Sequence, residues 1–394
     1  MRVRHIWLIA AVTAMWSGSV RADAPAPGSD YLLDVRYRLE SVDDDAFAHS
    51  ALAQTIRVQL GYRWQVTPEW SAVVEGAAVR ALDNRYNSTA NGRIAYPVVT
   101  DPETTQLNRA FVAYRNKHFG ATLGRQRIEL DNQRFIGTSG WRQTEQTFDA
   151  LALDGRIGEH TTLRYDYLDR VHRVFGDDHP NALLRERNLD AHLFNAAYDG
   201  FGGRWVGYGY LIDDQDVPTA STSTWGLRHT GSHKNGALEF GWTLEAAQQS
   251  GRGDNPMHGS RAYRLAEGTL AAAGITWRAG WERLGGDGTS ALQTPLATLH
   301  AFNGWADRFL VTPPRGLQDR YIGVSGTFGK PRWNVVWHEF RADRGSAHYG
   351  TELDASLGMP LTKQLSALLK LADYRSDGFS SNERKLWLQL EWKH

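Results

Sequence analysis

The sequence contains no cysteine among its 394 residues. This absence excludes a disulfide-stapled scaffold, metal or iron–sulfur sites built on cysteine, and a thiol nucleophile. An excess of one charge is also missing, because 44 Lys and Arg residues balance 44 Asp and Glu residues. A neutral chain creates no general basic field, so we do not expect nucleic acid as a partner.

Long hydrophobic runs are scarce. The mean hydropathy of −0.48 excludes a bundle of transmembrane helices, each of which needs about 20 consecutive apolar residues. The apolar run of note is at the N-terminus, where the basic Met1–Arg4 precedes the largely apolar Ile6–Trp16, and Val20-Arg21-Ala22 then fits a cleavage site. The pattern predicts a secretory signal peptide over residues 1–22 and a mature chain over 23–394.

The mature chain instead shows short runs in which apolar and polar residues alternate. In Tyr31–Glu40, apolar or aromatic residues occupy every second position and charged residues fill most of the others. Segments 55–64, 238–245 and 321–328 repeat the pattern. Alternation with a period of two is typical of β-strands that have one apolar and one polar face. We therefore expect an all-β fold.

The connections between these runs alternate between short turns and long loops. The short links are 67–69, 116–118, 158–160, 232–236, 329–331 and 359–361. The long links, rich in Gly, Asp, Asn, Ser and Pro, are about 83–105, 130–146, 175–188, 213–221, 251–260, 285–318 and 343–348. This alternation is typical of outer-membrane β-barrels, in which short turns face the periplasm and long loops face the outside.

Counting the runs predicts about 18 strands. They cover 31–40, 52–65, 70–82, 106–115, 119–129, 147–157, 161–174, 189–199, 203–212, 222–230, 236–249, 261–271, 274–284, 319–328, 332–342, 349–358, 363–374 and 384–392. An even number puts both ends of the chain in the periplasm, as in bacterial barrels. No internal domain boundary is visible, so we expect residues 23–394 to form a single transmembrane antiparallel β-barrel.

The end of the chain supports an outer-membrane location. The last run alternates from Leu386 to Trp392, and such C-terminal strands resemble the signal that the outer-membrane assembly machinery recognises, although Lys393 and His394 follow the final aromatic. Many of the 15 Trp residues flank strand ends and would form girdles at the membrane interfaces. We expect outer-membrane lipid and the assembly machinery as partners. A soluble sandwich or a periplasmic propeller is the alternative.

Arginine supplies about 37 of the 44 basic residues, and many Arg lie on the polar faces of the expected strands. A guanidinium group donates a bidentate fork to carboxylates, and acidic residues on the same faces would keep any one site from holding an anion too tightly. The strand candidates are Arg36, Arg38, Arg57, Arg63, Arg109, Arg125, Arg127, Arg164 and Arg170. Ion pairs that only stabilise the barrel, and a genome-wide preference for Arg, are the alternative explanations.

Two segments carry more apolar, aromatic and charged residues than a solvated loop needs. The first runs from Gly124 to Gly137 and continues through Trp-Arg-Gln at 141–143 to Thr-Phe-Asp-Ala at 147–150. The second spans 294–310 in the longest loop. Long loops of this composition are typical of functional elements, so we expect both to fold inward as a constriction or lid.

At these residues the chain resembles the alginate-export family of outer-membrane channels. The resemblance rests on Gly-Arg-Gln at 124–126, Asn-Gln-Arg-Phe at 132–135, Phe-Asp-Ala at 148–150, Thr-Pro-Leu-Ala-Thr at 294–298 and Gly-Trp-Ala-Asp at 304–307. It implies an 18-stranded monomeric barrel that secretes a polyuronate passively through an Arg-rich, electropositive pore gated by loops. The implied pore residues are Arg125, Arg127, Arg134, Arg142 and Asp149, with Asp307 and Arg308 in the inward loop.

We therefore expect a diffusion channel that passes an anionic polysaccharide such as alginate, or its oligomers, without a cofactor. A porin for small anionic solutes such as sugar acids is the alternative within transport. An outer-membrane enzyme in a plugged barrel is a rival from another class, but the sequence has neither a Gly-x-Ser-x-Gly elbow nor a His-Glu-x-x-His motif, so we do not expect an enzyme. The acidic runs at 43–45, 177–178 and 213–216 could hold Ca²⁺ in outer loops, although solvated loop acid is the favoured interpretation.

Overall fold

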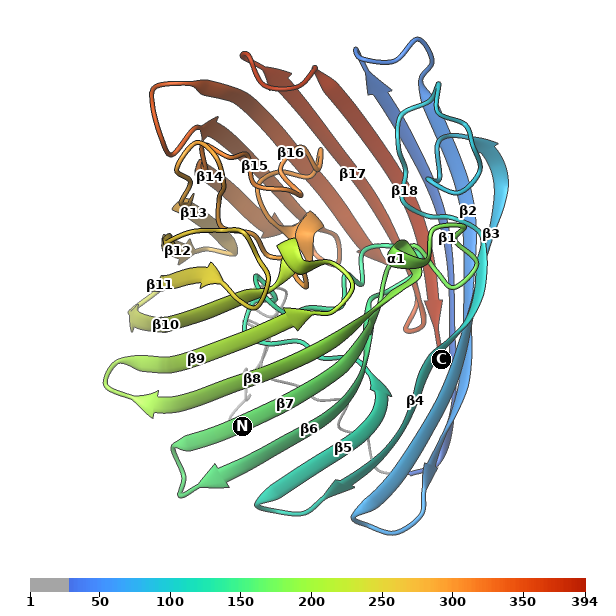
Figure 1. The fold of residues 1–394 in the computed structure, drawn as a ribbon, viewed down its shortest axis with the longest axis vertical. Coiled ribbons are helices and arrows are strands. Elements are labelled where there is room, and N and C mark those ends of the chain that lie inside the picture. The colour runs from blue at the N-terminus through green and yellow to red at the C-terminus, as the bar shows by residue number, and fades with distance from the viewer. Residues whose placement is uncertain (1–27) are drawn as a thin grey trace, which may run out of the picture.

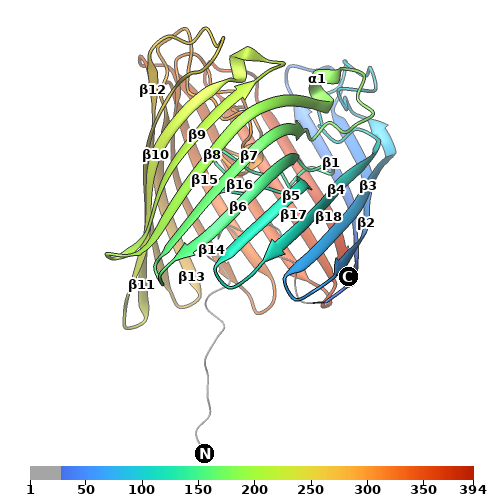
Figure 2. The ribbon, with the colours of Figure 1, turned by 60° about the horizontal axis from the view of Figure 1, so that its bottom comes forward.

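The computed structural model describes residues 28–394, and the expected signal peptide at 1–22 lies outside that range. The described chain forms one closed barrel of 18 antiparallel strands (Figures 1 and 2). Each strand pairs with its neighbours in sequence, and β1 closes the ring by pairing with both β2 and β18. The predicted fold class and the predicted number of strands are confirmed.

The strands follow one another without a crossover. They are β1 (Asp30–Asp44), β2 (Ala51–Gln65), β3 (Trp70–Arg85), β4 (Thr104–Arg115), β5 (Phe119–Gln126), β6 (Thr147–Ile157), β7 (Thr161–His172), β8 (Glu186–Gly200), β9 (Gly203–Asp214), β10 (Thr222–Asn235), β11 (Leu238–Gly251), β12 (Ser260–Ala272), β13 (Ile275–Leu284), β14 (Leu317–Thr327), β15 (Arg332–Arg341), β16 (His348–Pro360), β17 (Leu365–Ser376) and β18 (Glu383–Lys393). The short helix α1 (Ala182–Arg185) precedes β8, and the side chain of Asn181 caps it by accepting from the backbone N–H of Leu183. Within residues 28–394, no helix is long and apolar enough to cross a membrane.

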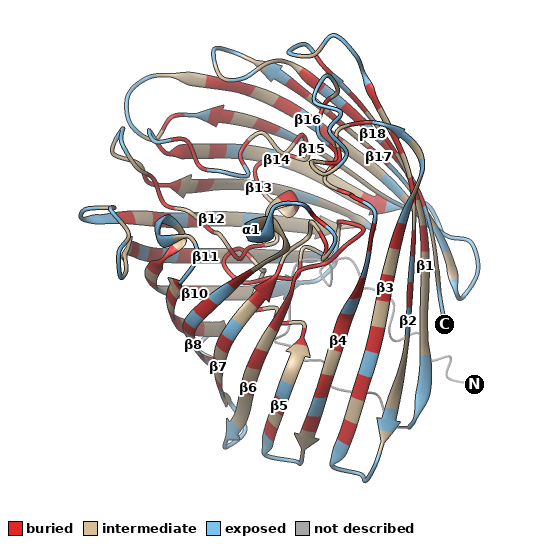
Figure 3. Cartoon of the chain, turned by 45° about the vertical axis from the view of Figure 1, so that its right-hand side comes forward, coloured by how far each residue is buried: buried red, intermediate tan, exposed pale blue. Residues whose placement is uncertain are grey.

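Alternation along each strand decides which side chains face the lumen. In β1, Arg36, Arg38 and Glu40 are buried inside the barrel, whereas the residues between them lie on the outer face. The colours of Figure 3 alternate along the strands in the same way. Exposed apolar residues such as Leu60, Leu123 and Ile322 cover the outside. An apolar outer band and a polar interior are what a membrane-spanning barrel requires.

The two ends of the barrel differ, as the link lengths predict. One end carries the short turns and the other carries the long loops and α1 (Figure 2). We call them the short-turn end and the long-loop end. Aromatic side chains cluster on the outer face of the short-turn end, where the Trp70 and Tyr114 rings are 5.1 Å apart between their centroids.

Most strand boundaries fall within a few residues of the prediction, and β6 matches it fully. The clearest difference is β5, which was expected to reach residue 129 but ends at Gln126 because Arg127 leaves the sheet to pair with Glu145. β10 and β11 are joined at 236–237, so the expected turn at 232–236 is largely strand.

Candidate functional site

Two long loops fold into the lumen and meet there. We call residues 127–146, between β5 and β6, loop A, and residues 285–316, between β13 and β14, loop B. Ile136 of loop A and Leu296 of loop B form a parallel bridge. The Gly137 N–H donates to the Leu296 carbonyl at 2.9 Å, and the Thr298 N–H donates to the Gln133 carbonyl at 3.0 Å. The two loops therefore form one continuous partition inside the barrel, which fits the predicted inward folding.

Apolar side chains anchor this partition to the wall. They form one buried cluster whose loop members include Ile128, Leu130, Phe135, Ile136, Leu292, Leu296 and Phe309, and whose wall members include Phe340, Tyr374 and Trp387. Burial of a large apolar side chain contributes about 1.5–3 kcal/mol. The apolar composition that set these loops apart in the sequence is thus a core that holds them inside the barrel.

Arg134 joins loop A to loop B and to the wall. Its Nε donates to Glu282 of β13 at 2.8 Å, and its Nη2 donates to Asn303 of loop B at 2.9 Å. Asn303 also donates to Glu282 at 2.5 Å. All three side chains are buried, so each polar group needs these partners to offset its loss of water. Arg134 holds the partition in place.

Loop B is anchored at a second point by a chain of polar contacts that the sequence analysis did not identify. Lys370 of β17 lies 2.6 Å from Nε2 of His300, and His300 Nδ1 lies 2.8 Å from Asp307. The Lys370 ammonium is also 4.1 Å from the ring centre of Trp141 and 3.7 Å from that of Trp305. When Lys370 is an ammonium it donates to Nε2, and Nδ1 then carries the proton that goes to Asp307.

The surroundings of these polar contacts shift two pKa values in loop B. Burial, together with the charge of Lys370, holds the pKa of His300 well below its ordinary value despite the nearby Asp307. Burial by itself would raise the pKa of Asp307, but His300, Lys385 and Arg142 together hold it well below the usual range. A neutral imidazole and an ionised carboxylate therefore meet in the loop.

Guanidinium–carboxylate pairs line the wall beside loop A. Arg36 pairs with Glu391 at 2.6 Å, and Arg57 pairs with Asp34 at 2.7 Å and with Glu391 at 3.3 Å. The Arg36 guanidinium also donates to three backbone carbonyls of loop A, at residues 140 to 142. These two Arg lie opposite each other in the β1–β2 register.

Arg38 is the next lumen-facing residue of β1 after Arg36. It donates to Gln389 at 2.7 Å and to the Trp141 carbonyl at 2.5 Å, and it lies 3.4 Å from Asp101. Its guanidinium stacks over the Trp141 ring, with 4.1 Å to the ring centre. Arg38 therefore ties loop A to the β1–β18 wall.

A second group of pairs lies on β3, β4 and loop A. Arg109 pairs with Glu75 at 2.6 Å, and Arg127 pairs with Glu145. Asn108 donates to both carboxylates, at 2.6 Å to Glu75 and 2.5 Å to Glu145. Burial raises the pKa of Glu145, but the charge and hydrogen bond of Arg127 outweigh it and hold that pKa at about 2. Glu145 is therefore ionised at every physiological pH.

Further candidates lie elsewhere on the wall and in the two loops. Arg164 pairs with Asp166 at 2.8 Å within β7. Arg142 of loop A pairs with Asp307 at 2.7 Å, and Arg308 of loop B pairs with Asp44 at 2.9 Å.

Arg125 and Asp149 differ from the other candidates, because they share the outer face of the sheet. Arg125 lies opposite Ala110 of β4 and Asp149 of β6, one step from the exposed Leu123, whereas Gln126 is buried inside. The two form an ion pair at 2.9 Å, and Asp149 also contacts His172. Their expected place in the pore is therefore not where the sheet positions them.

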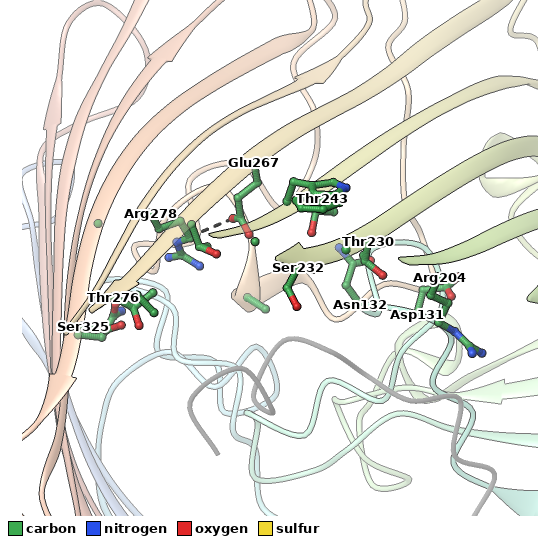
Figure 4. A pocket seen from close by; sticks show the side chains of 18 of the residues that line it. Asp131, Asn132, Arg204, Thr230, Ser232, Thr243, Glu267, Thr276, Arg278 and Ser325 are labelled. Carbon is green, nitrogen blue, oxygen red and sulfur yellow. Dashed lines mark ion pairs between the residues drawn. The ribbon is translucent and has the colours of Figure 1, made fainter. Parts of the chain in front are cut away.

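Below the partition, the lumen widens into a cavity of about 2180 Å³ that reaches the short-turn end (Figure 4). Asp131 and Asn132 of loop A and residues 301–305 of loop B face it from above. Its wall carries many hydroxyl groups, among them Thr230, Ser232, Thr243, Thr276 and Ser325. We call this cavity the vestibule. Such a polar wall suits a hydrated solute.

Four of the cations that line the vestibule near the turns differ from the rest. They are Lys117, Arg156, Lys234 and Arg332, and none has an ion-pair partner within the described residues. Glu239 stands opposite Lys234 in the β10–β11 register. The higher guanidinium groups are neutralised by carboxylates, so free positive charge gathers at this mouth.

The acidic loop runs have other partners than a metal ion. Across residues 28–394, no group of three or more His, Asp or Glu residues is arranged to hold one. Asp214 pairs with Arg187 at 2.8 Å, Asp178 accepts from the Thr105 N–H at 2.9 Å, and Asp44 is held by Arg308. These contacts tie the loops together.

Residues 30–284 match the sequence model of the family described as Alginate export. The chain belongs to this family. The expected family resemblance is confirmed, and with the closed barrel it makes the protein an outer-membrane channel. No curated protein sequence matches the chain.

Solved barrels share the fold at low sequence identity. OpdK of Pseudomonas aeruginosa, solved with vanillate, superposes with a TM-score of 0.72 at 14% identity, covering 93% of this chain and 98% of its own. OccAB4 of Acinetobacter baumannii gives 0.72 at 11% identity with the same coverage. OccK9 (OpdG) of Pseudomonas aeruginosa gives 0.72 at 15% identity, again with 93% and 98% covered. In bacterial barrels the short turns face the periplasm, so the vestibule opens there.

Proposed function

We propose that this channel conducts carboxylate-bearing sugars, as free uronic acids and as short, single-chain oligouronates. The observation that carries the proposal is the row of guanidinium groups on the lumen side, Arg36, Arg57, Arg109 and Arg127, each already holding a carboxylate of the protein. A solute carboxylate has the same shape and charge as those side chains. At Arg109 and Arg127, whose guanidinium groups donate to both oxygens of Glu75 and Glu145, it can replace the protein carboxylate in the same bidentate geometry.

The protein's own carboxylates keep this binding weak. A solute that enters such a pair competes with Glu391, Glu75 or Glu145, which take the guanidinium back when the solute moves on. Conduction needs sites that are favourable enough to enter and weak enough to leave. Interleaved acids supply this balance, whereas a bare row of Arg would retain a polyanion.

The joined loops A and B favour slender or small solutes. The partition is tied by backbone bonds at residues 133, 137, 296 and 298, and it narrows the lumen above the vestibule. This observation supports, as the second candidate function, a porin that passes small sugar acids but no oligomers. OpdK, which shares the fold, was solved with vanillate, itself a small carboxylate. A long alginate chain would require the two loops to separate.

The test is current block in a planar bilayer containing the refolded channel. We expect oligomannuronate to interrupt the current, whereas a neutral maltooligosaccharide of the same length leaves it unchanged. Block by a sugar acid but not by the oligomer would support the second candidate. Equal block by the neutral and the acidic oligomer would contradict both.

Arg127→Gln and Arg125→Gln form a matched pair for this test. Both remove one guanidinium from neighbouring positions, but Arg127 pairs with the buried Glu145 and Arg125 lies on the outer face. We expect Arg127→Gln to weaken the oligomannuronate block several-fold and Arg125→Gln to leave it unchanged. The heat-dependent gel mobility of each variant reports whether the barrel has folded.

A further inference from the structure

The outer face of the barrel carries a patch of Arg at the long-loop end of β12 to β15. Arg264 stands opposite Arg283 in the β12–β13 register, and Arg320 stands opposite Glu339 in the β14–β15 register. Arg320 lies two positions from the exposed Ile322, on the same face of β14. Arg341 follows Glu339 on that face of β15. These guanidinium groups therefore lie at the extracellular rim, directly above the apolar band.

A groove lies just below these charges. Its volume is about 560 Å³, and its walls include the side chains of Trp281, Ile322 and Trp337. Arg320 and Gln318 line its upper part. The outward face of a membrane-spanning barrel contacts acyl chains, so an apolar groove there is a place for one of them. An anionic lipid has a charged headgroup above its apolar acyl chains, and this groove has a cation above its apolar walls.

The carboxylates near the patch do not engage all of its guanidinium N–H donors. Glu339 pairs with Arg341 at 2.7 Å but lies 3.9 Å from Arg320, beyond hydrogen-bond distance. Asp343 pairs with Arg283 at 2.5 Å. Arg264 has no ion-pair partner among the described residues. Four guanidinium groups thus face two carboxylates, and Arg320 and Arg264 retain free donors.

We propose that this groove binds one phosphorylated glycolipid of the outer leaflet. One acyl chain lies against Trp281, Ile322 and Trp337, and a phosphate of the headgroup accepts from the Arg320 guanidinium, with Arg341 beside it. Arg matches phosphate geometry through its planar fork, and a phosphate is the anionic headgroup chemistry that stands at this height in a bilayer. The site is on the outside of the barrel and does not depend on the solute that the lumen carries.

Native mass spectrometry of the full chain in detergent tests the proposal. The probes are a lipid A that carries both phosphates and the same lipid after their removal. We expect the phosphorylated lipid to bind as one copy and roughly tenfold more tightly, the effect of one or two charge-assisted hydrogen bonds. Inorganic phosphate at the same concentration should not displace it. Displacement would mean that the site takes a free anion, and the lipid proposal would be wrong.

Three variants complete the experiment. Arg320→Gln should weaken binding of the phosphorylated lipid roughly tenfold and leave the dephosphorylated lipid unchanged. Ala279→Trp fills the groove from its wall and should reduce binding of both lipids. Arg80→Gln is the control, because Arg80 lies on the outer face of β3, on a different part of the ring. Equal retention of both lipids by the native chain and by Arg320→Gln would overturn the proposal. A dimer in which a second copy of the barrel covers the groove would overturn it as well.

Discussion

Arg142 of loop A and Asp307 of loop B form an ion pair with 2.7 Å between Nη2 and Oδ2. The two residues lie far apart in the sequence, and each also contacts a further residue. Asp307 accepts from His300, which in turn accepts from Lys370 of β17. The pair is therefore a second point, beside the Arg134 contacts, at which both loops and the wall are joined.

Arg142→Gln should loosen this junction. Breaking a buried ion pair by removing one partner typically costs about 3–5 kcal/mol, because the other charge stays buried without compensation. We expect larger and noisier single-channel currents, because loops A and B separate more often. Arg85→Gln is the control, since Arg85 forms an exposed pair with Asp83, and exposed pairs contribute little to stability. Unchanged conductance in Arg142→Gln would show that the loops do not set the channel width.

Acidification should weaken the attachment of loop B through His300. The pKa of His300 in the folded chain lies below its ordinary value of 6.5, so the neutral form is favoured by folding. The stabilisation is therefore complete above about pH 6.5 and is lost progressively as the pH falls below that value. Protonation of Nε2 would place a second donor against the Lys370 ammonium, at a distance of 2.6 Å.

Single-channel recordings at pH 7.5 and pH 5 measure this effect. We expect more frequent openings or larger currents at the lower pH. His300→Gln provides the comparison, because its amide oxygen can accept from Lys370 but does not titrate. A pH response that persists unchanged in His300→Gln would assign it to other groups.

Gly124→Ala should disturb the edge where β5 gives way to loop A. Gly124 has a φ of +121°, and a Cβ at this position would lie 2.3 Å from the carbonyl oxygen of Ala110. Both the backbone angle and the close approach exclude a side chain. We expect a loss of about 1 kcal/mol or more in stability, seen as a lower unfolding temperature on unboiled gels. Gly207→Ala is the matched control, since its Cβ would meet nothing within 4 Å.

The free cations of the vestibule should accelerate capture of anions from the periplasmic side. Replacement of Lys117, Arg156, Lys234 and Arg332 by Gln removes positive charge that forms no ion pair within the described residues. Charged mouths raise association rates in a salt-dependent way. Oligomannuronate added at that side should therefore block several-fold more slowly in the variant at low salt. The same replacement at Lys330 and Lys363, which do not line the vestibule, should have little effect; equal slowing by both sets would contradict the assignment.

Much of the barrel could be predicted from the sequence because alternation is a local signal. Arg36, Arg38 and Arg57 lie between outward apolar residues, so their lumen orientation follows directly from the pattern. Arg125 could not be placed in this way, because residues 124–127 are small or polar on both faces and give no alternation. Register shifts nearby, between Glu75 and Gly76 and between Asp149 and Ala150, further change which residues share a face.

The contacts that assemble the partition could not be predicted, because their partners are far apart in the chain. Arg134 meets Glu282 across 148 residues, and Lys370 meets His300 across 70. The sequence does contain one signal for the second contact. Lys370 is a lone cation in the apolar run 367–372, where a buried charge requires a partner.

The most direct test of the proposed function is a comparison of two sugars that differ at one carbon. Uptake of radiolabelled galacturonate and galactose into proteoliposomes measures whether a carboxylate helps a solute through this channel. We expect galacturonate to enter several-fold faster although it carries a charge, and Arg127→Gln to reduce that advantage. Equal or faster entry of galactose would contradict the claim that paired lumen arginines select for carboxylates.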